Sequence, residues 1–232
     1  MRPTRLNRER AARILDILEQ THADADCALH RNNAFELVVA TILSAQCTDE
    51  RVNQVTPALF RRYPTPDAMA RARPAQIETM IRPTGFFRAK TRSILGCARA
   101  LVAEHGGEVP RTMAAMVELP GVGRKTSSVV LGHAYGIAEG IAVDTHVLRV
   151  SNRLGIARGD DPIEVERQLM ALIPRERWIR TTDLLIFHGR RICQARRPAC
   201  GVCPVFSLCR WPYRQAYALG QTPRIKARGR PS

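Results

Sequence analysis

Four of the seven cysteines lie close together near the end of the chain, with the spacing Cys-x6-Cys-x2-Cys-x5-Cys. They are Cys193, Cys200, Cys203 and Cys209. Four thiolates this close in sequence can bind a single metal centre, and a loop that does so must fold back around that centre. Zinc and a cubane iron–sulfur cluster both accept four cysteines, so the spacing leaves both open. Disulfides and inert thiols are further alternatives, which a reducing cytosol and the crowding of the cysteines disfavour.

The remainder of the chain repeats its apolar residues with a helical period. Val165, Leu169 and Leu172 recur at this spacing, and Asp161 followed by Pro162 predicts a capped helix start just before them. The N-terminal stretch has the same amphipathic period and lacks the apolar core of a secretory signal. Strand-like alternation is nearly absent, and short breakers that contain Pro and Gly separate the helical stretches. We therefore predict an all-α protein of about ten helices.

A turn with the sequence LPGVG separates two of these helical stretches. Gly121 and Gly123 permit a tight turn that brings the backbone close to a ligand, and Val122 between them is expected to pack back between the helices. The first amides of the second helix, beside Arg124 and Thr126, form a site for an anion such as a DNA phosphate. An ordinary helix–turn–helix connection is the alternative for this segment alone.

Lys125 opens the second helix of this hairpin in a chain that otherwise uses arginine. Lys90 and Lys226 are the only other lysines among 36 basic residues. An arginine stays protonated near neutral pH, whereas a neutral lysine amine can attack a carbonyl carbon. The positive end of the helix dipole and the neighbouring Arg124 both disfavour the ammonium form. These features predict that Lys125 is a nucleophile, and an ordinary surface lysine is the alternative.

Asp144 and His146 begin another helical stretch, in the segment VDTH. Asp followed by Thr is typical of an N-cap, so a structural role competes with a catalytic one. A carboxylate that faced Lys125 across a groove could stabilise an oxocarbenium ion developing on a sugar, or transfer protons. The two roles are compatible, because a capping Asp is held in place. For His146 we expect structural support or a DNA contact rather than acid–base chemistry.

The formal net charge is +15, with a sequence pI near 10.7. Such a balance favours a polyanionic partner, most often nucleic acid, because basic side chains neutralise phosphates and release counterions. No apolar run approaches the length of a membrane-spanning helix, so no membrane is expected as a partner.

The segments LPGVGRKTSSVVL and VDTH and the cysteine spacing, in this order, resemble the helix-hairpin-helix DNA glycosylases of the endonuclease III type. The resemblance extends over most of the chain. It implies an all-α fold of two helical domains that flank a DNA-binding cleft, one of them a six-helix domain and the other an iron–sulfur cluster domain. The implied boundaries are 28–138 for the six-helix domain, with the hairpin at about 112–135, and 1–27 together with 139–213 for the cluster domain. Residues 214–232 are expected to form a basic, disordered tail.

The resemblance also assigns roles to individual residues. It implies that Lys125 attacks C1′ of the damaged nucleotide, that Asp144 is the essential aspartate, and that the four cysteines bind a [4Fe–4S] cluster. Gln46, in LSAQCTD, would fill the space left by a flipped base, and Phe86, in TGFFRAK, would be a wedge where leucine is more familiar. The other expected DNA contacts are Gly121, Val122, Gly123, Arg124, Thr126, Lys90, His146, Arg196 and Arg197.

The implied function is a bifunctional DNA glycosylase and abasic-site lyase of base excision repair. It would remove oxidised pyrimidines from double-stranded DNA through a lysine Schiff base and cut the strand by β-elimination. The expected setting is a monomer in the bacterial cytoplasm, associated with the nucleoid. The alternatives are an adenine-mismatch glycosylase, a branch that usually lacks the hairpin lysine, and a non-catalytic iron–sulfur protein that binds DNA.

Overall fold

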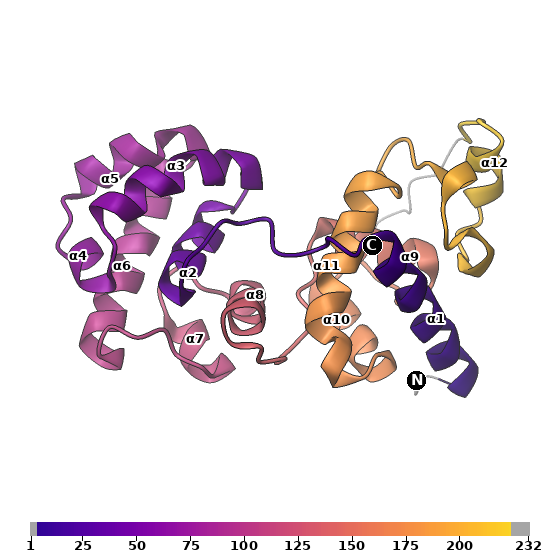
Figure 1. Cartoon of the computed structure of the whole chain (residues 1–232), viewed down its shortest axis with the longest axis horizontal. Helices are drawn as coiled ribbons and strands as arrows, with labels where there is room; N and C mark the ends of the chain where they lie inside the picture. The colour runs from indigo at the N-terminus through magenta and orange to yellow at the C-terminus, as the bar shows by residue number, and fades with distance from the viewer. Residues whose placement is uncertain (1–3, 224–232) are drawn as a thin grey trace, which may run out of the picture. The chain divides into compact units, whose positions relative to one another are not determined.

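The computed structural model describes residues 4–223, and within them all regular secondary structure is helical (Figure 1). The all-α fold class is confirmed. None of the described helices is both long and apolar enough to cross a membrane. The chain divides into two compact units. We call residues 26–142 the central unit, and the described parts of 1–25 and 143–232 the terminal unit.

The central unit is a bundle around one helix that is buried on most of its surface. Its elements are α2 (Ala34–Leu43), α3 (Asp49–Arg62), α4 (Pro66–Ala70), α5 (Pro74–Ile81), the 3-10 turn η1 (Arg82–Thr84), α6 (Phe87–His105), α7 (Met113–Glu118) and α8 (Arg124–Tyr135). The buried helix is α2, whose sequence is apolar on almost every face. It packs against α3, α6 and α8, and the long α6 also packs against α4 and α5.

The terminal unit joins the two ends of the chain. It contains α1 (Arg5–Thr21), α9 (Thr145–Leu154), α10 (Pro162–Leu172), the 3-10 turn η2 (Arg175–Arg177), α11 (Trp178–Arg191), the 3-10 turns η3 (Cys200–Val202) and η4 (Phe206–Leu208), and α12 (Arg214–Ala218). The predicted apolar face of α1 is buried, and α1 packs against α10 and α11. α11 also packs against α9.

The predicted start of α10 is confirmed in detail. The Ile163 amide donates a 3.0 Å hydrogen bond to the Asp161 carboxylate, and Pro162 occupies the first turn. Val165 and Leu169 are fully buried. The cap supplies an acceptor to an amide that has none within the helix, which fixes where α10 begins.

The prediction of a disordered tail from residue 214 is wrong for its first residues, because α12 begins there. The ring of Tyr217 stacks on Trp211 with centroids 5.2 Å apart, and the Arg214 guanidinium lies over Phe206. These aromatic contacts give the segment enough apolar surface to order it, which the basic composition concealed. The rest of the predicted tail, from residue 224, lies outside the described residues.

Candidate active site and metal centre

The hairpin joins α7 to α8 through a turn that rests on α6. Gly121 has φ +79°, a conformation that L side chains rarely adopt, and a Cβ added to it would lie 2.5 Å from the Cβ of Ser93. A Cβ added to Gly96 would lie 3.0 Å from the Cβ of Pro120. Both Ser93 and Gly96 belong to α6. The absence of side chains at the two glycines therefore allows the turn and α6 to approach closely.

Lys125 lies in the first turn of α8, and its side chain is exposed. Val122 is buried in the core of the central unit, so its predicted packing is confirmed, but its side chain is not placed to make the DNA contact that was also predicted. Gly123 is the N-cap of α8 and supplies no side-chain acceptor, so the first amides of the helix are without a capping side chain. The start of α8 therefore has uncapped amides that can bind a phosphate, and the primary amine of Lys125 lies in the same turn.

Two exposed residues of the central unit have strained backbones. Gln46 has φ 53° and Phe86 has φ 47°, and no other non-glycine residue in the described part of the chain has a positive φ. The Phe86 side chain, at the start of α6, is 66% exposed, which is unusual for a large aromatic ring. Such backbone strain costs about 1–3 kcal/mol and concentrates at functional sites. These two residues are the predicted gap-filling glutamine and the predicted wedge.

The prediction that Lys90 contacts DNA is contradicted by the structure. Lys90 is only 4% exposed, and its Nζ donates a 2.8 Å hydrogen bond to the Thr84 carbonyl oxygen. Burial lowers the pKa of the Lys90 ammonium, and Cys47 partly offsets this effect. Cys47 follows Gln46 and Thr84 precedes Gly85 and Phe86, so the buried ammonium lies near both strained loops. Lys90 therefore supports these loops from inside the protein.

Asp144 is the N-cap of α9, as predicted. Its Oδ1 accepts a 2.7 Å hydrogen bond from the Val147 amide, and the residue is half-buried. One carboxylate oxygen is thus committed to the helix. The cap uses this one oxygen, and a carboxylate has a second oxygen that can also accept hydrogen bonds.

His146 follows in the first turn of α9, where it packs against α11. Its Nδ1 lies 3.1 Å from Nη2 of Arg149, which also donates a 2.9 Å hydrogen bond to the Gly189 carbonyl oxygen. Burial lowers the pKa of His146, with Asp144 opposing the effect. These contacts give His146 the supporting role that was one of its two expected roles. A DNA contact by His146 stays a prediction.

The four cysteines line one cavity in the terminal unit, together with His188, Arg153 and Trp211. Two arginines hold the surrounding backbone in place. Arg10 on α1 donates to the carbonyl oxygens of Leu154 and Leu208 at 2.8 and 2.9 Å. Arg153 donates to the Gln194 carbonyl oxygen at 2.7 Å. The loop is therefore held in shape by charged donors that satisfy its backbone carbonyls.

The spacing of the four sulfur atoms can be compared with that of a single-zinc site. In the described part of the chain, no three of the cysteine Sγ atoms lie within 4.8 Å of one another. A single zinc ion with bonds of about 2.3 Å to sulfur would hold its tetrahedral ligands at about 3.8 Å from one another. The four sulfur atoms therefore do not have the closed spacing of a single-zinc site.

The thiols around the cavity lie in surroundings that resist ionisation. Burial raises the pKa of the Cys203 thiol to about 12, and it also raises the pKa of Cys200 and Cys209. The charge of each neighbouring thiolate adds to these shifts. Metal ligation requires thiolates, so this donor set fits a cationic centre that compensates their charge, as an iron–sulfur cluster does.

Two buried histidines lie beside this centre, and neither was predicted from the sequence. His188 on α11 is 1% exposed, and its Nε2 lies 3.7 Å from the Cys203 sulfur. His22, at the end of α1, is 2% exposed, and its Nε2 lies 3.3 Å from Nδ1 of His188. Burial lowers the pKa of His188 to about 4, so its imidazole is neutral at physiological pH. The position of His188, five residues before Cys193, was the available signal.

The predicted site residues are divided between the two units. The hairpin, Lys125, Gln46 and Phe86 belong to the central unit, whereas Asp144 and the four cysteines belong to the terminal unit. Arg196 and Arg197, on the loop between the first two cysteines, are exposed, as phosphate contacts must be. Three features together define a class of proteins: a hairpin with an exposed lysine, a capping aspartate, and four cysteines around one cavity.

That class is the helix-hairpin-helix base excision repair proteins. The model of the HhH-GPD superfamily base excision DNA repair protein matches residues 39–175, and that of the iron-sulfur binding domain of endonuclease III matches residues 193–209. The second match begins and ends at the first and last clustered cysteines.

Relatives and solved structures narrow the class. Endonuclease III of Synechocystis is 52% identical over 87% of this chain and 92% of that protein. The solved structure of a non-covalent endonuclease III–DNA complex superimposes with a TM-score of 0.83 at 45% identity, covering 88% of this chain and 95% of that chain. A trapped covalent endonuclease III–DNA intermediate gives the same values. This chain belongs to the endonuclease III family. The predicted family, enzyme class and iron–sulfur cofactor are confirmed.

Proposed function

We propose that this glycosylase and abasic-site lyase removes oxidised pyrimidines from duplex DNA through a Schiff base on Lys125. The observation that carries this proposal is the exposed amine of Lys125 in the first turn of α8, a helix start that has no capping side chain. A solved relative, 45% identical, was trapped as a covalent intermediate with DNA, which supports a covalent step here.

The chemistry begins once the damaged nucleotide has left the base stack, since C1′ is otherwise out of reach of a side chain. The neutral amine of Lys125 forms a bond to C1′ while the bond from C1′ to the base breaks, and the base leaves with a proton. Loss of the amine proton and opening of the sugar ring give an imine between Nζ and C1′. Removal of a proton from C2′ then expels the 3′ phosphate, which cuts the strand by β-elimination.

Asp144 contributes the carboxylate in this account. Its bond to the Val147 amide fixes the side chain, so that charge is held in place before the reaction begins. The negative charge stabilises the oxocarbenium character that develops at C1′ as the base leaves. A carboxylate at this position can also take the proton that the attacking amine loses.

The remaining residues bind and shape the DNA. The amides at the start of α8 bind a backbone phosphate, with Gly121 and Gly123 giving close access. Phe86 inserts beside the vacated position, and Gln46 occupies the space left by the base. Arg196 and Arg197 contact phosphates from the cluster loop, and the cluster held by the four cysteines fixes the shape of that loop. We further propose that the protein acts as a monomer in the bacterial cytoplasm, at the nucleoid.

A panel of end-labelled duplexes tests the lesion class. Each duplex carries thymine glycol, an abasic site, 8-oxoguanine or an adenine opposite guanine. We expect cutting without alkali at thymine glycol and at the abasic site, with release of the damaged base. Release of adenine from the mismatch alone would instead favour the adenine-mismatch branch. Gel-shift binding to every duplex without base release would favour a non-catalytic DNA-binding protein.

A further inference from the structure

Two buried histidines form a chain of contacts that ends on a cysteine of the metal centre. Nε2 of His22 lies 3.3 Å from Nδ1 of His188, and Nε2 of His188 lies 3.7 Å from Sγ of Cys203. The two rings are tilted by 60° with centroids 5.5 Å apart, so they meet edge to edge through nitrogen and are not stacked. All three residues belong to the terminal unit.

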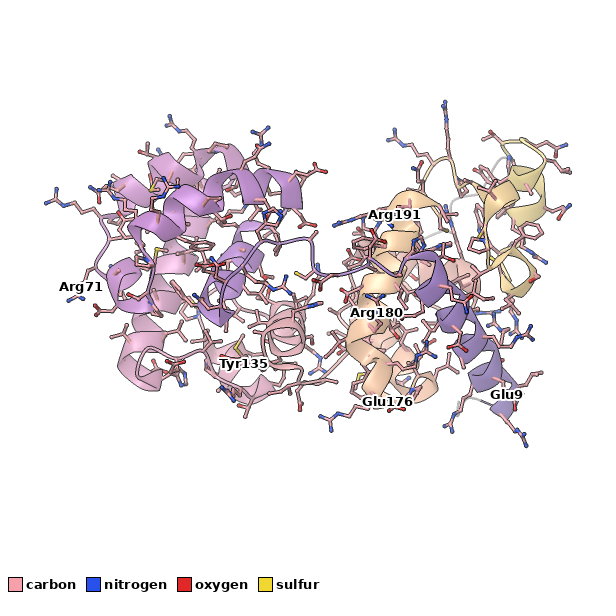
Figure 2. All side chains as sticks on the ribbon, in the orientation of Figure 1. Glu9, Arg71, Tyr135, Glu176, Arg180 and Arg191 are labelled. Carbon is pink, nitrogen blue, oxygen red and sulfur yellow. The ribbon has the colours of Figure 1, made fainter. Side chains whose placement is uncertain are left out.

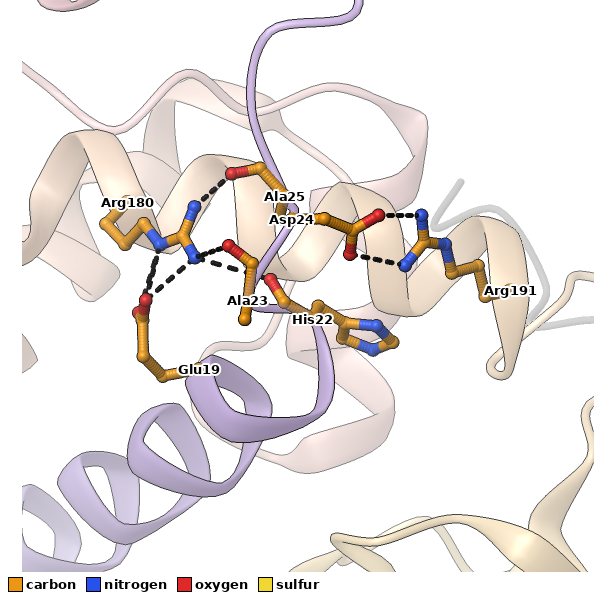
Figure 3. Close-up of polar contacts among 7 residues, drawn as sticks. All are labelled: Glu19, His22, Ala23, Asp24, Ala25, Arg180 and Arg191. Atoms are coloured by element: carbon orange, nitrogen blue, oxygen red, sulfur yellow. Dashed lines mark hydrogen bonds and ion pairs between the residues drawn. The ribbon is translucent and has the colours of Figure 1, made fainter.

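The backbone that carries His22 is anchored to α11 by two arginines (Figure 3). The Arg180 guanidinium donates to the carbonyl oxygens of His22, Ala23 and Ala25, and it also binds the Glu19 carboxylate. Arg180 and Arg191 both extend from α11 (Figure 2).

The second arginine fixes the next residue along the same segment. The Arg191 guanidinium makes two hydrogen bonds to the Asp24 carboxylate, at 2.8 and 2.7 Å (Figure 3). Planar, two-point contacts of this kind restrict orientation as well as distance. The His22 ring is therefore held at a defined position against His188, which is itself on α11.

The hydrogen-bond partners available to His22 and to Cys203 determine which nitrogen of each histidine carries the proton. A neutral imidazole has one N–H donor and one acceptor nitrogen. Nδ1 of His22 is buried and has no hydrogen-bond partner. Suppose that His188 donated from Nδ1 to Nε2 of His22. The proton of His22 would then be on Nδ1, which is buried and has no acceptor, and Nε2 of His188 would turn a lone pair toward Cys203. If His22 donates from Nε2, His188 donates from Nε2 toward the sulfur, which is the arrangement that suits a metal-bound thiolate.

We propose that His188 donates a hydrogen bond from Nε2 to the thiolate of Cys203 when the cluster is bound, and that His22 is a positioning residue that selects this tautomer of His188. Hydrogen bonds to the sulfur ligands of an iron–sulfur cluster withdraw negative charge from it and raise its reduction potential. The same bond stabilises the thiolate as a ligand and so slows loss of iron. Through these contacts, His22 at the end of α1 influences the reduction potential of a cluster whose ligands lie near the other end of the sequence.

The test compares cluster-loaded wild-type protein with His188→Phe, His22→Phe and the double variant. Phe preserves the ring volume and removes the nitrogens. We expect the reduction potential, measured by protein-film voltammetry, to fall in His188→Phe and to fall less in His22→Phe. We expect the double variant to match His188→Phe, because His22 acts only through His188. Release of iron to a chelator should be about tenfold faster in His188→Phe.

Two controls separate the hydrogen bond from packing. His188→Gln retains an N–H donor and should keep most of the wild-type potential, and His30→Phe removes an exposed histidine of the central unit and should change nothing. An unchanged potential in His188→Phe with the cluster intact would overturn the proposal, as would additive effects in the double variant. If the Phe variants fail to fold, ¹⁵N-labelled histidine NMR of the wild-type holoprotein gives the answer directly. The proton of His22 is expected on Nε2, and a proton on Nδ1 would contradict the proposal.

Discussion

The buried ammonium of Lys90 donates a 2.8 Å hydrogen bond to the carbonyl oxygen of Thr84, and this bond closes the turn that leads into Phe86. The turn ends with Gly85 at φ 70° and Phe86 at φ 47°, so two successive residues have a positive φ, and Phe86 has the left-handed helical conformation. Strain of this kind persists only where surrounding contacts determine the conformation. Lys90 supplies such a contact, from a side chain that is only 4% exposed.

Replacing Lys90 by Met should separate global stability from loop function. Met keeps most of the buried stem but loses the hydrogen bond, while removal of a desolvated charge compensates part of that loss. We expect the free energy of unfolding in urea to change by no more than about 1 kcal/mol. Fluorescence of a DNA base analogue beside the lesion should nevertheless show reduced base flipping. Normal flipping in Lys90→Met would contradict the supporting role.

The wedge role of Phe86 can be tested by two substitutions at the same position. Phe86→Gly relieves the left-handed strain but gains unfolded-state entropy, so the two effects on stability should roughly cancel. We expect its kcat/KM on thymine glycol to fall about tenfold or more, because the unstacked state loses its support. Phe86→Leu retains an apolar wedge and should keep most of the activity. Wild-type activity in Phe86→Gly would show that Phe86 does not act as a wedge.

Asp144 has a structural role and a proposed chemical role, and its variants distinguish them. Asn caps helices as well as Asp, so Asp144→Asn should keep the bond to the Val147 amide and the wild-type Tm. We expect its rate of base release to fall about 100-fold or more, because the charge is lost. Asp144→Ala should lose about 1 kcal/mol of stability in addition. Full activity in Asp144→Asn would leave Asp144 with the capping role alone.

The two glycines of the hairpin should respond differently to the same change. Gly121→Ala places a Cβ 2.5 Å from the Cβ of Ser93 at φ +79°, so we expect destabilisation of about 1–3 kcal/mol in urea unfolding. Gly123 has φ −94°, and a Cβ there meets nothing within 4 Å. Gly123→Ala should therefore fold normally but bind DNA more weakly, since the methyl group obstructs the approaching phosphate. Equal DNA affinity in Gly123→Ala and wild type would argue against a phosphate at this turn.

Local signals in the sequence predicted the elements that depend on local chemistry. Asp161 and Asp144 were recognised as caps because Asp competes for backbone amides within one turn. Val122 was expected to pack inward because it lies between two glycines in a tight turn, and it does. The cysteine spacing predicted one metal centre, and the resemblance implied a [4Fe–4S] cluster, which the match to the iron-sulfur binding domain of endonuclease III supports.

Features that depend on tertiary contacts could not be predicted from local sequence patterns. Lys90 was expected to contact DNA because it lies in TGFFRAK, the segment that the resemblance assigned to the wedge loop. Its burial depends on tertiary packing of α6. The partnership of His22 with His188 joins residues far apart in the sequence, so no spacing indicates it. The ring of Tyr217 in α12 stacks on Trp211, and this contact orders the segment. The prediction of disorder considered only the basic composition of the segment and not this contact.

The central claim is that Lys125 carries the Schiff base, and borohydride trapping tests it most directly. Wild-type protein is incubated with duplex DNA that contains thymine glycol or an abasic site, reduced, and resolved on a denaturing gel. Lys125→Ala and Lys226→Ala are run beside it as variant and matched control, because Lys90, the third lysine, is buried. We predict a covalent band in the wild type and in Lys226→Ala that is absent in Lys125→Ala, with the adduct mapped to Lys125 by mass spectrometry. A band of equal intensity in Lys125→Ala would contradict the account.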